Sequence, residues 1–160
     1  MNAIRIGFTG HQTMSPATRS AIRTQLCREI NSREEVVGLS SLAAGADQIF
    51  ADTILKTGNQ LEAVIPSAKY ETAFGDSAER FEYQRLLHQA TYVITLAFDE
   101  PTEQAFYAAG RDVVERSQVL LAVWDGKPSA GLGGTADIVT YAHTLGREVV
   151  VIWPTGSSRK

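Results

Sequence analysis

The stretch Trp-Asp-Gly-Lys-Pro-Ser-Ala-Gly-Leu-Gly-Gly-Thr-Ala-Asp, residues 124–137, decides the fold of this chain. An apolar run precedes it at residues 119–123, and apolar residues at helical spacing follow it from Ile138 to Leu145. The pattern predicts a strand, a glycine-rich loop and a helix. Glycine lacks a Cβ, so the loop can bring backbone N–H groups close to an anion, and the helix start adds unpaired N–H groups and a partial positive charge. Four glycines between residues 126 and 134 exceed what a turn needs, so we expect a phosphate here rather than a loop whose glycines only let the chain turn.

The composition is that of an ordinary globular protein. Of the 160 residues, 44% are hydrophobic and 21% are charged, so we expect one domain with a sizeable core. The formal net charge of -3 argues against a chain whose main task is to hold the backbone of DNA or RNA. Cys27 is the single cysteine, which excludes an intrachain disulfide and a cysteine metal site. The sequence shows no signal peptide and no apolar run long enough to span a bilayer, so we expect a cytoplasmic protein without membrane contact.

Strand and helix patterns alternate along the chain. The predicted strands are residues 3–9, 35–41, 60–66, 92–97, 119–124 and 148–153. The predicted helices are about residues 16–31, 47–58, 77–90, 102–117 and 135–145, the first of them capped by Ser15 and begun by Pro16. This alternation predicts an α/β fold, a single doubly wound, mostly parallel sheet with helices on both faces. We expect the domain to span residues 1–154 and residues 155–160 to form a flexible tail.

Three loops of small residues are expected at one edge of this sheet. They lie at Gly10, at Gly45 and at residues 131–134, and each follows a predicted strand. Ligands of doubly wound sheets sit outside the carboxyl ends of the strands, so the three loops converge on one candidate site. The candidate ligand-binding residues are Gly10, His11, Ala44, Gly45, Asp47, Trp124, Asp125, Gly131, Gly133, Gly134, Thr135 and Asp137.

For several of these side chains the sequence allows both a functional and a purely structural interpretation. His11 follows the first strand, where it could bond a base or sugar, act as an acid or base, or bond only the loop backbone. Asp47 and Asp137 fall in the first turn of helices, where a carboxylate either accepts hydrogen bonds from ribose hydroxyls or only caps the helix. Trp124 could stack on a base or pack into the core, and Asp125 is a further candidate beside it. The three histidines lack metal-ligand spacing, so no metal site is expected.

The best-known phosphate-binding motifs do not fit. Residues 131–136 match the loose pattern G-x-G-x-x-A, but they follow the fifth predicted strand and no acidic residue stands about twenty positions further on. The Gly-Lys-Ser/Thr of the P-loop does not occur. These departures argue against hydride transfer and against nucleoside triphosphate hydrolysis, and we expect no cofactor.

Two loops carry a resemblance to a known superfamily. Ser-Leu-Ala-Ala-Gly-Ala-Asp, residues 41–47, is similar to the Ser-Gly-x-Ala-x-Gly-x-Asp turn of the DNA-processing protein A family, and Gly-Gly-Thr-Ala-Asp, residues 133–137, is similar to the Gly-Gly-x-Gly-Thr-x-x-Glu loop of the "lonely guy" phosphoribohydrolases. The chain thus resembles the SLOG superfamily of Rossmann-like domains, named for these two groups. The resemblance implies a site for nucleotides or nucleotide-derived molecules, some of them signalling ligands. Aligned on Gly134 and Thr135, the sequence has Ile138 where the phosphoribohydrolases have a catalytic glutamate.

Two hypotheses about function stay open, and a third is weaker. The first is a module that binds a nucleotide-type small molecule as a sensor, which the missing glutamate favours. The second is an enzyme that cleaves an N-glycosidic or phosphoribosyl bond, with Asp137 or Asp47 as the catalytic acid or base and His11 assisting. The third is a nucleic-acid interaction protein, which the negative charge disfavours. Apolar residues at 22–30 and 105–114, together with the resemblance, predict a homodimer or a higher homo-oligomer.

Overall fold

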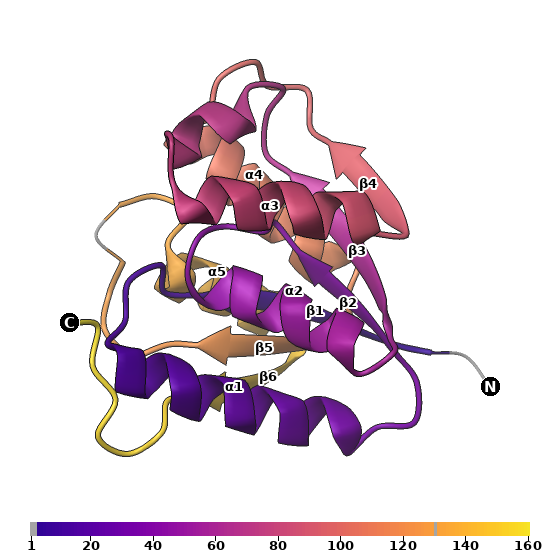
Figure 1. Ribbon diagram of the computed structural model, residues 1–160, viewed down its shortest axis with the longest axis vertical. Helices are drawn as coiled ribbons and strands as arrows, with labels where there is room; N and C mark the ends of the chain where they lie inside the picture. Colours follow the sequence, from indigo (N-terminus) through magenta and orange to yellow (C-terminus); the bar gives the residue numbers. More distant parts are fainter. Residues whose placement is uncertain (1–2, 130) are drawn as a thin grey trace.

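The computed structural model describes residues 3–129 and 131–160 (Figure 1). The strands in these ranges are β1 (Ile4–Gly10), β2 (Val36–Ser40), β3 (Gln60–Ile65), β4 (Tyr92–Thr95), β5 (Val119–Val123) and β6 (Glu148–Ile152). The α-helices are α1 (Pro16–Asn31), α2 (Ala46–Lys56), α3 (Ala78–Gln89), α4 (Glu103–Glu115) and α5 (Thr135–Thr144). A short 3-10 helix, η1 (Tyr70–Phe74), follows β3.

The strands form one parallel sheet in the order β4-β3-β2-β1-β5-β6. In the centre of the sheet Gly7 of β1 pairs with Leu39 of β2 on one side and with Leu120 of β5 on the other. The chain therefore runs outward from β1 to β4 and then crosses back to add β5 beside β1 and β6 beside β5. This change of direction is the point where doubly wound sheets bind ligands, so it lies between the loops after β1 and β5.

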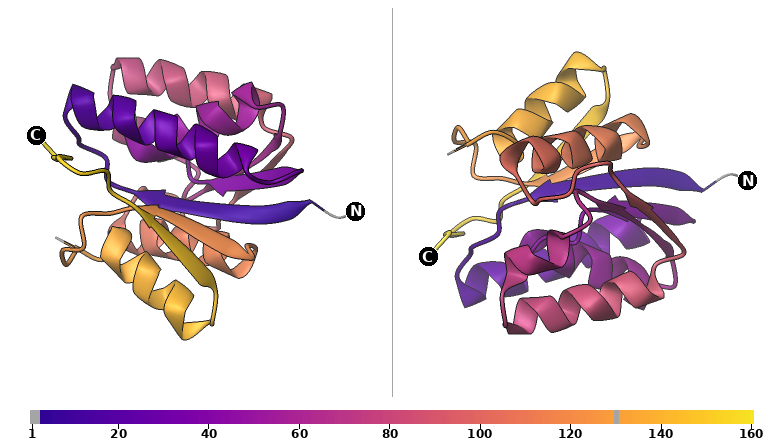
Figure 2. Two further views of the ribbon diagram at one scale, coloured as in Figure 1. Left: turned by 90° about the horizontal axis from the view of Figure 1, so that it is seen from below. Right: turned by 90° about the horizontal axis from the view of Figure 1, so that it is seen from above.

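Helices cover both faces of the sheet, as the sequence predicts. Figure 2 shows α1, α2 and α3 on one face and α4 and α5 on the other. Strands β2 and β5 are buried along their whole length, which explains their continuous apolar runs. Edge strand β4 is largely exposed, with Tyr92 at 53% of its accessible surface.

Helix α1 illustrates how local sequence and packing agree. The Ser15 side chain accepts a hydrogen bond from the Thr18 N–H and so caps the helix, and Pro16 occupies its first turn. Ile22, Leu26 and Ile30 recur at every fourth position and are fully buried against the sheet. Each such side chain contributes about 1.5–3 kcal/mol by leaving water.

The apolar residues that motivate the expected oligomer lie inside the protein. Those of α1 face the core, and Ala105, Ala109, Val113 and Val114 of α4 are also buried. They pack against the sheet because both segments are the crossover helices that cover it. No helix among the described residues is long and apolar enough to cross a membrane.

Residues 155–160, expected to form a flexible tail, make specific contacts. The carbonyl of Ser158 accepts a hydrogen bond from the Ser15 N–H at 3.0 Å, and the Ser158 N–H donates to Thr18 Oγ1 at 2.8 Å. The segment thereby satisfies backbone and side-chain groups at the start of α1 and brings Arg159 toward the sheet edge.

Candidate functional site

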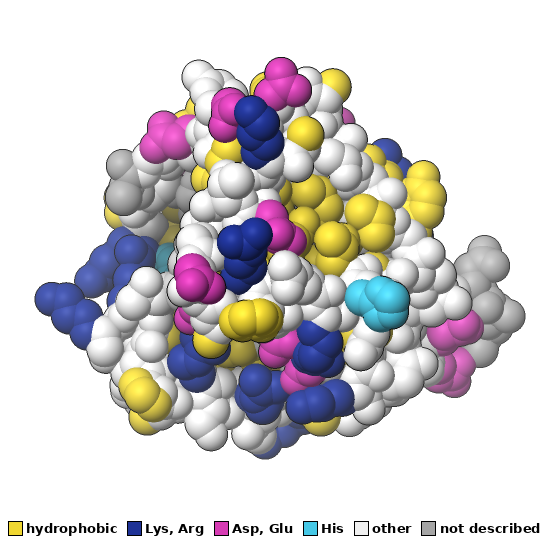
Figure 3. Space-filling view, turned by 45° about the horizontal axis from the view of Figure 1, so that its top comes forward, with side chains coloured by type: hydrophobic (Ala, Val, Ile, Leu, Met, Phe, Trp, Pro, Cys, Tyr) yellow, Lys and Arg dark blue, Asp and Glu magenta, His cyan; other side chains and the backbone are white. Residues whose placement is uncertain are grey.

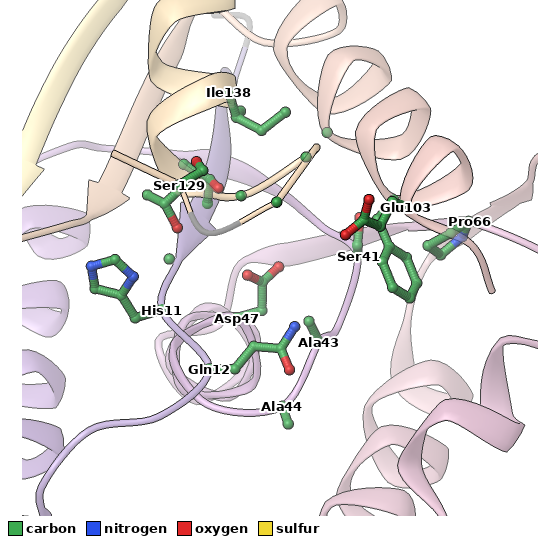
Figure 4. A pocket seen from close by; sticks show the side chains of 18 of the residues that line it. His11, Gln12, Ser41, Ala43, Ala44, Asp47, Pro66, Glu103, Ser129 and Ile138 are labelled. Atoms are coloured by element: carbon green, nitrogen blue, oxygen red, sulfur yellow. The ribbon is translucent and has the colours of Figure 1, made fainter. Parts of the chain in front are cut away.

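A cavity of about 620 Å³ lies at the carboxyl ends of the strands (Figure 4). Its walls come from the loop after β1, the turn between β2 and α2, the segment around η1, helix α4, the loop before α5, and the C-terminal segment. The candidate residues that line it are Gly10, His11, Ala44, Asp47, Gly131, Gly133, Gly134 and Thr135. The other candidates, Gly45, Trp124, Asp125 and Asp137, are not among the lining residues, but each contacts a residue that lines the cavity.

The loop before α5 is shaped by a close backbone approach. Gly133 has φ of 86°, in the left-handed region, and a Cβ there would lie only 2.9 Å from the Tyr107 backbone nitrogen. The Gly133 N–H donates to Asp137 Oδ2 at 3.0 Å. The Asp137 carboxylate is therefore engaged with the loop backbone and does not line the cavity.

Helix α5 begins without a side-chain cap, because its N-cap is Gly134. The Asp137 N–H already has two acceptors, the Gly134 carbonyl and Ser129 Oγ. In contrast, the N–H groups of Thr135 and Ala136 have no protein acceptor among the described residues. Since both residues line the cavity, these are the donors that the helix start offers to a ligand.

The turn between β2 and α2 packs tightly against the loop after β1. Leu42 has φ of 58° and is the only non-glycine residue in the described ranges with positive φ. This backbone conformation is strained for a residue with a bulky side chain. Gly45 has φ of 85°, and a Cβ there would lie 2.3 Å from the Gln12 carbonyl oxygen. The Ala46 N–H donates to the His11 carbonyl at 3.0 Å. Gly45 thus serves the site by letting the two loops touch.

Asp47 is a buried carboxyl group that lines the cavity. Only 6% of the residue is exposed, and its Oδ2 accepts a hydrogen bond from Ser40 Oγ at 2.7 Å. Burial raises the pKa of Asp47 to about 7, even though the hydrogen bonds from Ser40 and from the Ser41 backbone lower it. Burial, with the neighbouring Asp47 charge, also raises the pKa of Tyr70 well above its ordinary value. Near neutral pH the Asp47 carboxyl can therefore either accept or donate a proton.

His11 belongs to a group of three side chains, with Asp125 and Arg159, beside the carboxyl ends of β1 and β5. Its Nε2 accepts a hydrogen bond from the Asp125 N–H at 3.0 Å. Burial, reinforced by the Arg159 charge, lowers the pKa of His11 and outweighs the opposing effect of Asp125. The ring is therefore neutral at pH 7, and with Nε2 accepting, the proton is assigned to Nδ1. His11 is thus a hydrogen-bond donor from Nδ1, with its Nε2 occupied by the protein.

Trp124 packs into the core rather than facing the cavity. Its Nε1–H donates to the Lys127 carbonyl at 2.9 Å, and its ring packs against the apolar cluster that contains Leu120 and Val139. The indole is amphipathic, so its apolar face is buried while the N–H bonds the loop. Of the two roles open to Trp124, the structural one explains its contacts.

Several cavity-lining residues escape sequence reasoning: Gln12, Tyr70, Glu103, Phe106, Lys127, Ser129 and Arg159. Lys127 and Ser129 lie within the glycine-rich stretch itself and follow from it once the loop is taken as the site. Glu103 begins α4 and Arg159 lies near the C-terminus, and no local motif marks either one. In the described ranges no group of three or more His, Cys, Asp or Glu side chains could hold a metal ion.

The chain shares a Rossmann-like α/β fold with several solved structures. No protein-family model matches the sequence, and no curated protein matches it. The chain is similar to DNA processing protein A from Streptococcus pneumoniae, with a TM-score of 0.73 and 18% identity over 96% of this chain. It is also similar to DNA processing protein A from Helicobacter pylori, with a TM-score of 0.70 and 17% identity over 97% of this chain.

A third structural relative is a molybdenum cofactor binding protein from Rippkaea orientalis. Its TM-score is 0.61, with 18% identity over 94% of this chain and 77% of that protein. The chain spans about half, 52%, of the S. pneumoniae protein and 68% of the H. pylori protein. At these identities the likeness is one of fold. The H. pylori protein binds single-stranded DNA, so the same fold serves both a small molecule and a nucleic acid.

Proposed function

We propose that this chain binds a nucleotide or a nucleotide-derived ligand in the cavity and acts as a sensor or carrier of it. The observation that carries the proposal is the pair of N–H groups, from Thr135 and Ala136, that have no acceptor among the described residues and belong to residues lining a cavity of about 620 Å³. A phosphate accepts hydrogen bonds from such groups and is stabilised by the helix dipole. The volume falls within the range of roughly 300–1,000 Å³ typical of small-molecule sites.

The remaining lining suits the rest of such a ligand. Phe8, Tyr70 and Phe106 provide apolar surface for the face of a base. The carboxyl groups of Asp47 and Glu103 can accept hydrogen bonds from ribose hydroxyls or from N–H groups of the base (Figure 4). The similarity to a molybdenum cofactor binding protein supports the proposal, because that relative, which matches 94% of this chain, binds a small molecule.

A ligand screen by thermal unfolding tests this proposal. We expect at least one of adenosine, guanosine and cytidine monophosphates, dinucleotides and cyclic nucleotides to raise the melting temperature, since a ligand at a hundredfold excess over Kd stabilises the native state by about 2.7 kcal/mol. The variant Gly134→Val should lose this shift, because a Cβ at residue 134 would lie 2.6 Å from Ser129 Oγ and displace the loop. The ligand-free variant should remain folded. Normal binding by Gly134→Val would show that the loop does not hold the phosphate.

A second candidate function is hydrolysis of a nucleotide N-glycosidic bond. The observation that favours it is the Asp47 carboxyl, whose pKa is raised to about 7 inside a cavity. Two features favour ligand binding without hydrolysis. Ile138 stands where the phosphoribohydrolases that the sequence resembles have a glutamate, and the Asp137 carboxylate accepts a hydrogen bond from the Gly133 N–H.

Incubation with adenosine, guanosine and cytidine monophosphates separates the two functions. We expect no release of free base above a buffer control, because Ile138 stands at the position of the phosphoribohydrolase glutamate and the Asp137 carboxylate accepts from the Gly133 N–H. Base release that persists in Asp137→Asn but disappears in Asp47→Asn would identify an enzyme with Asp47 as its acid or base.

Nucleic acid remains a weaker alternative. On the face in Figure 3, Lys and Arg side chains are interspersed with Asp and Glu rather than gathered into one basic patch. Arg23, Lys56 and Arg85 of α1, α2 and α3 all pair with the buried Asp52. Three cations are thus engaged within the protein, which lowers the positive potential available to a phosphate backbone.

Homo-oligomer formation and a cytoplasmic location stay predictions. The buried apolar residues of α1 and α4 do not offer a contact surface, so a dimer would use other residues, such as the exposed Tyr92 and Val93 of β4. The molar mass from light scattering at micromolar concentration distinguishes a monomer from a dimer.

A further inference from the structure

Arg159 reaches the cavity from the far end of the sequence. It lines the cavity together with Lys127 and the residues at the start of α5, and its side chain is 42% exposed. The segment that carries it is held in place by Ser158, whose carbonyl and N–H bond Ser15 and Thr18. The guanidinium is therefore positioned by the fold rather than projecting freely into solvent.

A buried carboxylate orients the Arg159 guanidinium. Asp125, 9% exposed at its side chain, forms an ion pair with Arg159 through Oδ2, 2.8 Å from Nε, and accepts a hydrogen bond from Nη2 at 3.1 Å through Oδ1. Burial alone would raise the pKa of Asp125, but the hydrogen bonds from the Lys127 N–H and from Arg159, together with His11, outweigh it and lower this pKa. The carboxylate is thus ionised at neutral pH and holds the guanidinium in a two-point contact.

This contact leaves part of the guanidinium free. Arginine has five N–H donors in a rigid plane, and Asp125 occupies the edge made by Nε and Nη2. Nη2 also lies 3.2 Å from His11 Nε2, whereas Nη1 has no acceptor among the described residues. Because Nη2 faces both Asp125 and His11, the N–H groups of Nη1 are the donors that remain for a phosphate oxygen.

We propose that Arg159 is a ligand-contacting residue whose Nη1 group binds the phosphate-bearing end of the ligand, so that the segment 155–160 forms part of the binding site. The inference rests on the proposed nucleotide function and adds to it a residue that lies outside the glycine-rich loop. Asp125 is its positioning residue. Phosphate then meets cations from two separate segments, Lys127 before α5 and Arg159 near the C-terminus.

Calorimetric titration of the full chain with adenosine and guanosine monophosphates and with inorganic phosphate tests the role of Arg159. The variant Arg159→Gln should bind the nucleotide at least about tenfold more weakly, the loss typical of one hydrogen bond to a charged group. Lys160→Gln is the matched control, because it removes the same charge from the neighbouring position, where only backbone groups make contacts. Arg159→Lys should recover part of the affinity, since it keeps the charge but loses the planar contact with Asp125.

An NMR titration of His11 reports the position of Arg159 without any ligand. The Arg159 charge lowers the pKa of His11, so this pKa should rise in Arg159→Gln and stay unchanged in Lys160→Gln. Equal nucleotide affinity of Arg159→Gln and Lys160→Gln overturns the inference and leaves the proposed function intact. Wild-type protein that binds none of the three probes overturns both the proposed function and the inference.

Discussion

Replacing Gly45 by alanine lowers the free energy of unfolding by about 3 kcal/mol, whereas the same change at Gly58 costs about 1 kcal/mol. Both glycines have positive φ, 85° and 79°, so an alanine is strained at either position. Around Gly58 no atom of the described residues, apart from Gly58 itself and its two chain neighbours, lies within 4 Å of an added Cβ. At Gly45 an added Cβ would lie 2.3 Å from the Gln12 carbonyl oxygen. Because the neighbour is backbone, the loop after β1 itself must move.

Urea and thermal unfolding of both variants measure this difference. For a chain of this size, 3 kcal/mol corresponds to a fall in melting temperature of roughly 6–12 °C. Gly45→Ala should also lose ligand-induced stabilisation, since Gln12 lines the cavity, while Gly58→Ala should retain it. Equal costs at the two positions would show that the loops do not depend on this close approach.

Much of the fold follows from local sequence. The Ser15 and Pro16 pair predicts the start of α1, and alternating strand and helix patterns predict a parallel sheet with helices on both faces. The end of β4 shows the limit of this reasoning. The apolar run predicts a strand to residue 97, but β4 ends at Thr95. The Leu96 N–H donates to the carbonyl of Ile65, which is the last residue of β3, so β3 offers no partner further along. Pairing partners decide a strand end, and a single segment does not contain them.

The location of the site follows from topology, but its chemistry does so only in part. Parallel strands end at a common edge, so loops after β1, β2 and β5 must meet there. The contact between Arg159 and His11 joins residues 148 positions apart, and no periodicity or motif encodes it. Similarly, Asp47 and Asp137 both lie in the first turn of a helix, yet one lines the cavity and the other accepts a hydrogen bond from the Gly133 N–H. Tertiary packing separates two roles that look alike in the sequence.

Replacing Asp47 by asparagine makes the protein more stable than wild type at pH 8, although Asp47 lines the cavity. Folding raises the pKa of Asp47 from 3.8 to about 7 by burial, so the native state binds more protons than the unfolded state between these values. The contribution of the Asp47 carboxyl to the free energy of unfolding is therefore fully present below pH 3.8 and is lost as the pH rises through about 7. A shift of about three units corresponds to a loss on the order of 4 kcal/mol, and Asp47→Asn should be free of it. The amide can keep a hydrogen bond to Ser40 Oγ.

The neighbouring Asp52 supplies a control of opposite sign on the same helix. Burial raises its pKa, but hydrogen bonds from Lys56, Arg85 and Arg23 outweigh burial and lower it. The contribution of Asp52 to the free energy of unfolding is therefore present above its pKa in the unfolded chain and is lost as the pH falls through its pKa in the folded protein. Asp52→Asn should accordingly destabilise the protein at pH 8. Urea unfolding of the three proteins from pH 4 to pH 8 tests both signs. If wild type and Asp47→Asn lose stability in parallel as the pH rises, the Asp47 carboxyl is ionised throughout this range and is not the group poised to exchange a proton in the cavity.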